Sequence, residues 1–402
     1  MRAVMTSALP LEGIRVLELG HIIAGPSAGL LLADLGADVI KVERPDEGDQ
    51  SRGMPAGTSA NFHFLNRNKR SIAIDLKGSA DGRALFLRLA AVSDVVIDNF
   101  AHGAVEGLGL GYDVLARANP GVIYLALKGF LPGPYEARPF LDELAQMSAG
   151  LAFMTGPRGQ PLRAGASIVD VGAAAYGVIA VLAALHQRAQ TGRGQKITSG
   201  LYETTVFWVG QWLAQYAATG EPSVPMPEIR QGTRMGWGIY HLFEAADGQQ
   251  IFIGVTSNAH WERFCAEFGL TDLLADERLA DNAKRVAARD WLPGRIADEM
   301  RRYPSDELSA RLERARVPFA PLRRPDELVD DPHLNAAEQF VATPLPGRGA
   351  AKLPKLPVRS SAFDMGLRRP APRLGEHTRE VLQELGIPRD EIDALASRRV
   401  IA

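Results

Sequence analysis

Short apolar runs alternate with helix-like segments along the first 130 residues, and this alternation limits the fold more than any other feature of the chain. Residues 14–20 (IRVLELG) and 37–43 (ADVIKVE) flank AGPSAGLLLADLG, whose apolar residues have helical spacing. Further apolar runs follow at residues 71–76, 94–100 and 121–130. Apolar strands separated by helices are typical of a mostly parallel sheet that is covered on both faces. The sequence therefore predicts an α/β domain whose ligands bind at the carboxyl ends of the strands.

Two proline-rich stretches without helical or strand periodicity divide the chain. Between them, IYHLFEAADGQQIFIGV predicts a hairpin that turns at Asp247-Gly248, and helical patterns follow it. A chain of 402 residues is long enough for two or three domains. We therefore predict a discontinuous, Rossmann-like large domain of residues 1–220 and 332–402, a small inserted α+β domain of residues 236–316, and linkers at 221–235 and 317–331.

Charge and cysteine content exclude several classes of protein. With 45 Lys+Arg against 47 Asp+Glu, the chain lacks the basic excess of a nucleic-acid binder. Its one cysteine, Cys265, permits neither a disulfide within the chain nor a thiolate zinc site. The longest uncharged stretch, Val171 to Leu185, is shorter than the roughly 20 residues that span a bilayer, and it predicts a buried core helix. We expect a cytoplasmic enzyme without a metal, a membrane partner or a nucleic-acid partner.

The segment ASIVDVGAAAYG contains the most informative acidic residue, Asp170. Apolar residues that we interpret as a strand lead to Asp170, and a helical pattern begins directly after it. On this spacing alone, Asp170 fits an ordinary helix N-cap. The alternative is functional, because a helix N-terminus lowers the pKa of a carboxylate and offers amides to a developing oxyanion. A carboxylate in that position can act as a covalent nucleophile.

Six segments, in this order, resemble the family III CoA-transferases, a family that also contains the α-methylacyl-CoA racemases. They are LEGIRVLELGHIIAGPSAGLLLADLGADVIKVER, NRNKRSIAIDLK, DNF, GVIYLALKGF, the Asp170 helix with TGRGQ, and ADGQQIFIGVTSNAHWERFC. The resemblance implies an enzyme that moves CoA from an acyl-CoA thioester to a free carboxylic acid. Acyl-CoA and coenzyme A are then substrates, and no cofactor is permanently bound. Asp170 matches the family's catalytic aspartate, which passes through a mixed anhydride to an aspartyl-CoA thioester.

The resemblance also implies which residues contact CoA. They are the turn His21, Ile22, Ile23 and Ala24, together with Arg44, Arg70, Asn99, Phe100 and Lys128. Gly107 stands where formyl-CoA transferases carry an arginine on CoA, and Arg138 is an alternative source of that contact. Without the resemblance, these positions fit ordinary strand-end, capping, core and solvated residues.

The glycine-rich lid of formyl-CoA transferases is reduced here to Met235-Gly236-Trp237-Gly238. Gly236 and Gly238 could hinge a loop over Asp170 while Trp237 excludes water, although a plain turn before a strand fits equally well. Arg230 and Arg234 could bind the second carboxylate of a dicarboxylate such as succinate or a C5 relative. The alternative is that both are solvated loop arginines.

Other functions remain as alternatives. A racemase of the same family needs an acid and a base, but Leu141 and Ser257 stand where racemases place a histidine and a glutamate. A nicotinamide dehydrogenase needs G-x-G-x-x-G after the first strand, where this chain has GHIIAG. A non-catalytic relative that binds acyl-CoA would be expected to lack Asp170. For quaternary structure, the resemblance implies an interlocked homodimer in which each chain passes through an opening formed by the two linkers of the other.

Overall fold

The computed structural model describes residues 8–231 and 236–402, and it divides into two compact units. The large unit comprises Met1–Leu151, Arg163–Ala214 and Pro332–Ala402, and the small unit comprises Ala152–Leu162 and Gln215–Asp331. The large unit is thus discontinuous, with the small unit inserted into it. The division differs from the expected domain bounds because residues 152–162 and both expected linkers belong to the small unit.

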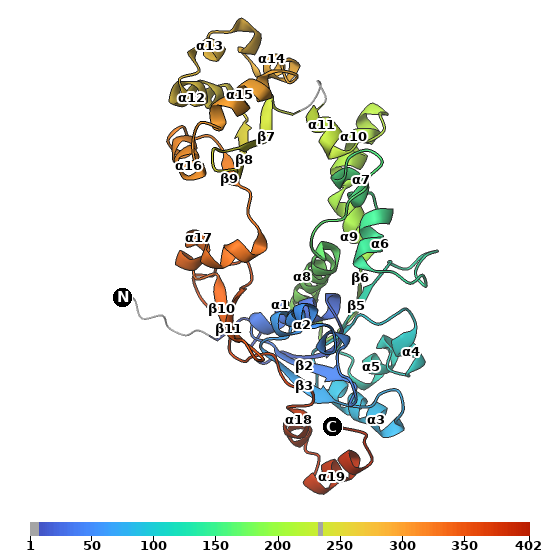
Figure 1. Ribbon diagram of the computed structural model, residues 1–402. Helices are drawn as coiled ribbons and strands as arrows, with labels where there is room; N and C mark the ends of the chain where they lie inside the picture. Colours follow the sequence, from blue (N-terminus) through green and yellow to red (C-terminus); the bar gives the residue numbers. More distant parts are fainter. Residues whose placement is uncertain (1–7, 232–235) are drawn as a thin grey trace. The chain divides into compact units, whose positions relative to one another are not determined.

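The core of the large unit is a six-stranded parallel sheet with the strand order β3-β2-β1-β4-β5-β6 (Figure 1). Its strands are β1 (Arg15–Leu19), β2 (Asp38–Glu43), β3 (Lys69–Ala73), β4 (Val95–Asp98), β5 (Ile123–Lys128) and β6 (Lys196–Gly200). Each apolar run predicted to be a strand overlaps one of these strands. The direction of the strand order reverses between β1 and β4, and ligands of such sheets bind in the crevice that opens there.

Helices cover both faces of this sheet, and the strand residues alternate between two cores. On one face, Val16 and Val95 pack with α1 (Ala24–Asp34) and α8 (Ile168–Thr191). On the other face, Leu17 and Val96 pack with α3 (Ala80–Ala91), α5 (Tyr112–Ala118), α18 (Thr378–Glu384) and α19 (Arg389–Ser397). Successive side chains of a strand point to opposite faces. Because both faces are buried, the strands carry apolar residues on both faces, and the charged residues Glu18, Lys41 and Lys69 are buried among them.

Helix α8 is the one helix, within the described part of the chain, that is long and apolar enough to cross a membrane. A core helix of a globular protein has the same composition. Ala174, Val178 and Val181 of α8 are buried in the core that it forms with the sheet. The helix predicted for residues 171–185 is present, but only one of its faces is buried, since Val171 and Ile179 are exposed.

Two glycines allow α1 to lie against the end of β1. A Cβ atom on Gly25 would lie 2.7 Å from the Cα of Gly20, and a Cβ atom on Gly29 would lie 1.9 Å from Oε2 of Glu18. Both distances are shorter than van der Waals contact, so no larger residue fits without displacing its neighbour. The chain lacks the dinucleotide-binding glycine pattern, yet it uses glycine for the same close packing of strand and helix.

Two helix breaks in the C-terminal half of the chain lie at glycines. The apolar segment after Gly200 forms two helices, α9 (Leu201–Trp208) and α10 (Gly210–Thr219), because a glycine disfavours the helix interior. Near the C-terminus, Gly386 adopts φ +74° and separates α18 from α19. The remaining elements that begin in this unit are α2 (Ala56–Leu65), α4 (Ala104–Gly107), α6 (Asp142–Ser148), α7 (Leu151–Thr155), α17 (Pro332–Ala336), β10 (Phe340–Leu345) and β11 (Gly349–Pro354).

The small unit contains a three-stranded antiparallel sheet, β7-β8-β9. β7 (Ile239–Glu244) and β8 (Gln250–Val255) form the predicted hairpin, and β9 (Phe319–Pro321) pairs with β8 from a stretch that was expected to be a linker. Cys265 is buried in the core of this unit, where burial raises the pKa of its thiol to about 12, as expected for a packed thiol. The helices are α11 (Met226–Gln231), α12 (Asn258–Phe268), α13 (Thr271–Leu274), α14 (Asn282–Ala287), α15 (Leu292–Met300) and α16 (Ser305–Arg314).

Candidate active site

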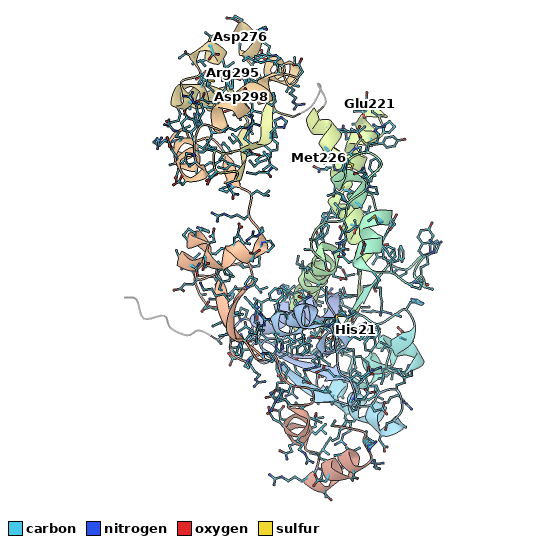
Figure 2. All side chains as sticks on the ribbon, in the orientation of Figure 1. His21, Glu221, Met226, Asp276, Arg295 and Asp298 are labelled. Carbon is cyan, nitrogen blue, oxygen red and sulfur yellow. The ribbon has the colours of Figure 1, made fainter. Side chains whose placement is uncertain are left out.

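The carboxyl ends of β1, β4 and β5 open into one pocket of the large unit, with a volume of about 640 Å³. This size is within the range of roughly 300–1,000 Å³ that is usual for ligand sites. Figure 2 marks His21, which follows the end of β1 and lies at the pocket. Nine residues selected from the sequence line it: His21, Ile22, Ile23, Ala24, Asn99, Phe100, Lys128, Arg138 and Asp170. The fold therefore brings segments that are far apart in the sequence together at the reversal of strand order.

Asp170 lies in the first turn of α8, which begins at Ile168. The strand predicted before Asp170 does not form, and Asp170 is not the N-cap. The cap is supplied instead by Asp142 of α6, whose Oδ2 accepts hydrogen bonds from the amides of Val169 at 2.7 Å and Asp170 at 3.0 Å. The other oxygen, Oδ1, accepts a bond from Gln146 at 2.6 Å. These bonds fix the first turn of α8, and with it the backbone of Asp170.

Burial raises the pKa of the Asp170 carboxyl to about 7, and the negative charge of Asp142 contributes to the rise. The prediction that the helix N-terminus lowers this pKa is therefore wrong. The physical reason is that amides of the first turn donate to Asp142 and not to the Asp170 carboxylate. A carboxyl group with a pKa of about 7 is about half ionised at neutral pH and is poorly solvated, which suits a carboxylate nucleophile.

The turn after β1 is held by the turn after β4. The His21 amide donates to Oδ1 of Asn99 at 3.0 Å, and Nδ2 of Asn99 donates to the His21 carbonyl at 3.0 Å. The rings of His21 and Phe100 lie 5.4 Å apart. Burial lowers the pKa of His21, so its imidazole is neutral at pH 7. The Asn99 amide, expected to contact CoA, thus also fixes the shape of the neighbouring turn.

Lys128, at the end of β5, lines the pocket while its ammonium group is held by β4. Its Nζ donates to Oδ2 of Asp98 at 2.6 Å and to the Phe100 carbonyl at 2.7 Å. Burial raises the pKa of Asp98, and the ammonium of Lys128 opposes that rise. Lys128 therefore orders the Asp98–Phe100 turn in addition to placing a positive charge in the pocket.

Two arginines add positive charge to the rim of the pocket. The exposed Arg138 stacks its guanidinium 3.7 Å from the ring centre of Tyr135. Arg163, which also lines the pocket, donates to Glu143 at 3.2 Å. Both arginines are therefore positioned by neighbouring side chains and lie on the same pocket as Asp170.

Two arginines proposed to contact CoA do not line this pocket. Arg44 follows β2, its side chain is 57% exposed, and it pairs with Asp46 and Glu47 on its own loop. Arg70 is only 5% exposed, and its guanidinium is bound by three carboxylates, those of Asp38, Glu380 and Glu384. A guanidinium saturated in this way joins β3 to α18 and has no donor left for a phosphate, so the prediction for Arg70 is wrong.

The segment Gly236–Gly238 is anchored within the small unit. Asn282 donates to the Gly236 carbonyl at 3.0 Å and accepts from the Gly238 amide at 3.2 Å, and Arg289 donates to the Trp237 carbonyl at 2.7 Å. A Cβ atom on Gly238 would lie 2.5 Å from the Cβ of Arg285. Close packing explains this glycine better than a hinge does. Arg234 and the side chain of Arg230 lie outside the described residues.

Asp142, Glu143 and Arg163 line the pocket and were not selected from the sequence as site residues. The signal for Asp142 was the run DELAQMS, in which two acidic residues open a helix. That pattern predicts the start of α6. It does not predict that the Asp142 side chain reaches the N-terminus of another helix 28 residues later, because such a contact depends on the packing of α6 against α8.

Comparison with known proteins agrees with this geometry. Residues 11–378 match the model of CoA-transferase family III. The chain is 34% identical over 399 residues to a succinyl-CoA–D-citramalate CoA-transferase of Chloroflexus aurantiacus (98% of each chain), and 35% identical over 390 residues to a succinate–glutarate CoA-transferase of Agrobacterium fabrum (94% and 96%). A crystal structure of a CaiB/BaiF family protein from Brucella suis superimposes with a TM-score of 0.85 at 33% identity, covering 94% of this chain and 100% of that one. The chain therefore belongs to CoA-transferase family III and is a CoA-transferase.

Proposed function

We propose that this enzyme transfers CoA between dicarboxylic acids through a covalent intermediate on Asp170. The observation that carries the proposal is the placement of Asp170, a half-buried carboxyl with a pKa of about 7, in the same pocket as the turns after β1 and β4. A carboxylate used as a nucleophile must be exposed to substrate yet weakly solvated, and Asp170 combines both properties.

In the proposed reaction, a carboxylate oxygen of Asp170 attacks the thioester carbonyl, and the C–S bond breaks to release CoA thiolate. The product is a mixed anhydride between Asp170 and the donor acid. The thiolate then attacks the Asp170 carbonyl, which forms an aspartyl-CoA thioester and releases the donor carboxylate. The acceptor carboxylate takes up CoA by the same two steps in reverse. No proton is gained or lost overall, so the mechanism does not require a charged imidazole at His21, whose pKa is lowered by burial.

Apolar side chains support the anhydride step. Ile22, Ile23, Phe100, Leu127 and Phe140 line the pocket together with Asp170. An anhydride is hydrolysed by water, so a wall of apolar groups extends its lifetime enough for the thiolate to attack.

Two observations favour dicarboxylates as substrates. Both relatives described above are named for dicarboxylic acids, namely succinate, citramalate and glutarate. Arg138 and Arg163 lie on the pocket, and either guanidinium can pair with a carboxylate remote from the reacting one. An unpaired carboxylate taken from water is strongly penalised, so a cation is needed wherever the remote group binds. Arg234, suggested from the sequence as a contact for the second carboxylate of a dicarboxylate, remains a proposed contact of the same kind.

A panel of acceptor acids tests the proposal. With succinyl-CoA as donor and detection of the new acyl-CoA by mass, we expect kcat/KM for glutarate to exceed that for pentanoate, which has the same chain length, by about 10- to 150-fold. This range corresponds to roughly 1.5–3 kcal/mol for a hydrogen bond to a charged group. Equal values for the two acids, or a preference for pentanoate, would exclude a dicarboxylate site.

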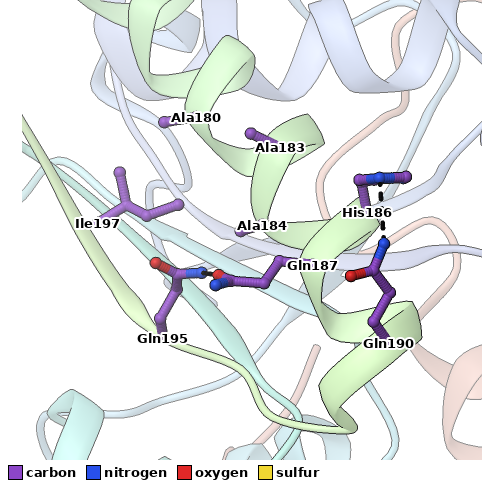
Figure 3. A pocket seen from close by; sticks show the side chains of 8 residues that line it. All are labelled: Ala180, Ala183, Ala184, His186, Gln187, Gln190, Gln195 and Ile197. Carbon is purple, nitrogen blue, oxygen red and sulfur yellow. Dashed lines mark hydrogen bonds between the residues drawn. The ribbon is translucent and has the colours of Figure 1, made fainter.

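We also propose that the enzyme is an interlocked homodimer. Large apolar side chains are exposed along α8 and α9 of the large unit, among them Val171, Ile179 and Phe207. Beside them, Ala180, Ala183 and Ala184 of α8 line a shallow pocket next to Gln195 and Ile197 of the edge of the sheet (Figure 3). Large exposed apolar side chains of this kind favour an interaction site, and a second copy of the chain is the partner that family membership favours.

Sedimentation on dilution tests the homodimer. Two chains that pass through each other cannot separate without unfolding, so we expect a single dimeric species from micromolar to nanomolar concentration. As a control, a freely dissociating dimer would convert to monomer over the same dilution series. A folded, active monomer at nanomolar concentration would refute the interlocked arrangement.

A further inference from the structure

Four charged side chains are buried together beneath the turn that follows β1. Glu18, Lys41 and Lys69 have no exposed side-chain surface, and neither has Asp49. Nζ of Lys41 lies 2.8 Å from both Glu18 and Asp49, and Nζ of Lys69 lies 2.6 Å from Glu18. Two positive and two negative groups thus neutralise each other. Buried ion pairs often contribute no more stability than apolar residues of similar volume, so stability alone does not account for this cluster.

The cluster is bonded directly to the backbone on both sides of His21. Nζ of Lys41 donates to the Gly20 carbonyl at 2.7 Å, and Oδ1 of Asp49 accepts from the Ile22 amide at 3.2 Å. Asn99 binds both backbone groups of His21 itself. The polar backbone groups of the turn are therefore bound by side chains from β2, from the loop after β2 and from the end of β4.

Ile22 is the strained residue in this turn. Its φ is +65°, in the left-handed region that β-branched residues rarely adopt. Such a conformation costs on the order of 1–3 kcal/mol and persists only where the surroundings enforce it. Ile22 also lines the pocket that contains Asp170. The strain is therefore located at the site, and the bond from Asp49 is one of the interactions that maintain it.

Asp49 is itself rigidly held. The residue is 3% exposed, and its amide donates to Glu43 at 2.9 Å. Its Oδ1 accepts from the amide of Ser51 at 2.8 Å and from the Ser51 hydroxyl at 2.7 Å. Glu43 is the last residue of β2 and is paired with Arg52 at 2.7 Å. Hydrogen bonds through Asp49 therefore link the Ile22 amide to Glu43, at the end of β2.

We infer that Asp49, supported by Lys41, is a positioning residue for CoA transfer: it holds the His21–Ile22 turn in the strained conformation that shapes the pocket containing Asp170. The inference rests on the proposed site but not on the identity of the acids. Asp49 does not line the pocket, so it acts through Ile22 and not on the substrate.

The test compares Asp49→Ala with Asp34→Ala. Asp34 is a matched control, because it is also fully buried and paired with a buried cation, Arg67, at 2.6 Å, but it does not line the pocket. We expect both variants to lower the melting temperature. Only Asp49→Ala should lower kcat, by about 10- to 100-fold per folded enzyme, while KM for acyl-CoA changes less than threefold. Misplacing a reacting geometry by about 1 Å costs up to about 100-fold in rate.

Two further measurements keep the inference testable if Asp49→Ala folds poorly or the substrates differ from those proposed. Asp49→Asn retains an oxygen acceptor for the Ile22 amide, so it should restore most of the kcat lost in Asp49→Ala. Amide hydrogen exchange of residues 20–24 should be at least tenfold faster in Asp49→Ala than in Asp34→Ala, whichever acid is the substrate.

Equal kcat and equal exchange in the two alanine variants would overturn the inference, and so would an asparagine variant as impaired as the alanine one. Failure of the dicarboxylate or nucleophile proposals would appear instead in the acid panel and in the Asp170 variants.

Discussion

Replacing Asp170 with asparagine or alanine is expected to reduce CoA transfer by about three to five orders of magnitude, the usual cost of removing a covalent nucleophile. The covalent route requires an ionised oxygen at this position. No other carboxylate that lines the pocket belongs to the first turn of α8. The measurement is kcat with saturating acyl-CoA and acid. In the wild type, hydroxylamine or borohydride should trap a CoA adduct on the peptide that contains Asp170. Transfer at a near wild-type rate in Asp170→Ala would eliminate the nucleophile assignment.

A stability measurement separates this loss of activity from unfolding. Because the pKa of Asp170 is raised to about 7 from its ordinary value of 3.8, the folded chain binds this proton more tightly than the unfolded chain. Stability contributed by the protonated group is therefore complete below about pH 4 and is lost as the pH rises to 7. Asp170→Asn cannot ionise, so it should melt at a higher temperature than the wild type at pH 8 and at a similar temperature at pH 4. A variant that is more stable yet inactive has lost chemistry and not its fold.

Replacing Asp142 is expected to have the second-largest effect. Asp142→Ala leaves the amides of Val169 and Asp170 without their acceptor, which costs about 1–3 kcal/mol and should lower kcat by about 5- to 150-fold as the first turn of α8 loosens. Asp142→Asn keeps an acceptor but removes the charge that helps to raise the pKa of Asp170. The acid limb of kcat/KM, expected near pH 7 in the wild type, should therefore shift to lower pH in Asp142→Asn.

A pH profile from about 5 to 9 checks this prediction. Asp113→Asn is the control, since Asp113 is an exposed acidic residue in the first turn of α5 and does not line the pocket. Its profile should match that of the wild type. An unchanged acid limb in Asp142→Asn would show that Asp142 does not influence the ionisation on which the rate depends.

The sequence was sufficient to predict the α/β architecture of the large unit, because strands and helices are indicated by patterns within short segments. The inner strands β1, β4 and β5 are buried on both faces and form short, mostly apolar runs, and helical patterns separate the predicted strands. The inserted unit was predicted from its hairpin and from the two proline-rich stretches. Where local signals were weak, prediction was less accurate. The strand at Phe319–Pro321 depends on pairing with β8, a partner that no short window of sequence contains.

Within the site, the sequence was enough to select nine of the residues that line the pocket. His21, Asn99, Lys128 and Asp170 were selected for their positions after predicted strands or by family resemblance, and all line one pocket. Arg70 was selected in the same way and is instead saturated by three carboxylates, two of them from a helix more than 300 residues later. A sequence pattern predicts the end of a strand, but it does not predict which distant charges will lie beside it.

Only the tertiary structure decided the pKa of Asp170 and the backbone conformation of Ile22. The pKa of Asp170 is raised and not lowered because Asp142, from another helix, takes the amides that a helix N-terminus would otherwise offer to it. Ile22 adopts a strained φ because Asp49, Lys41 and Asn99 converge on its turn from three separate segments. Both effects arise from electrostatic contacts between residues 21 to 78 positions apart, and the energies of such contacts depend on distance and burial, which only the folded chain defines.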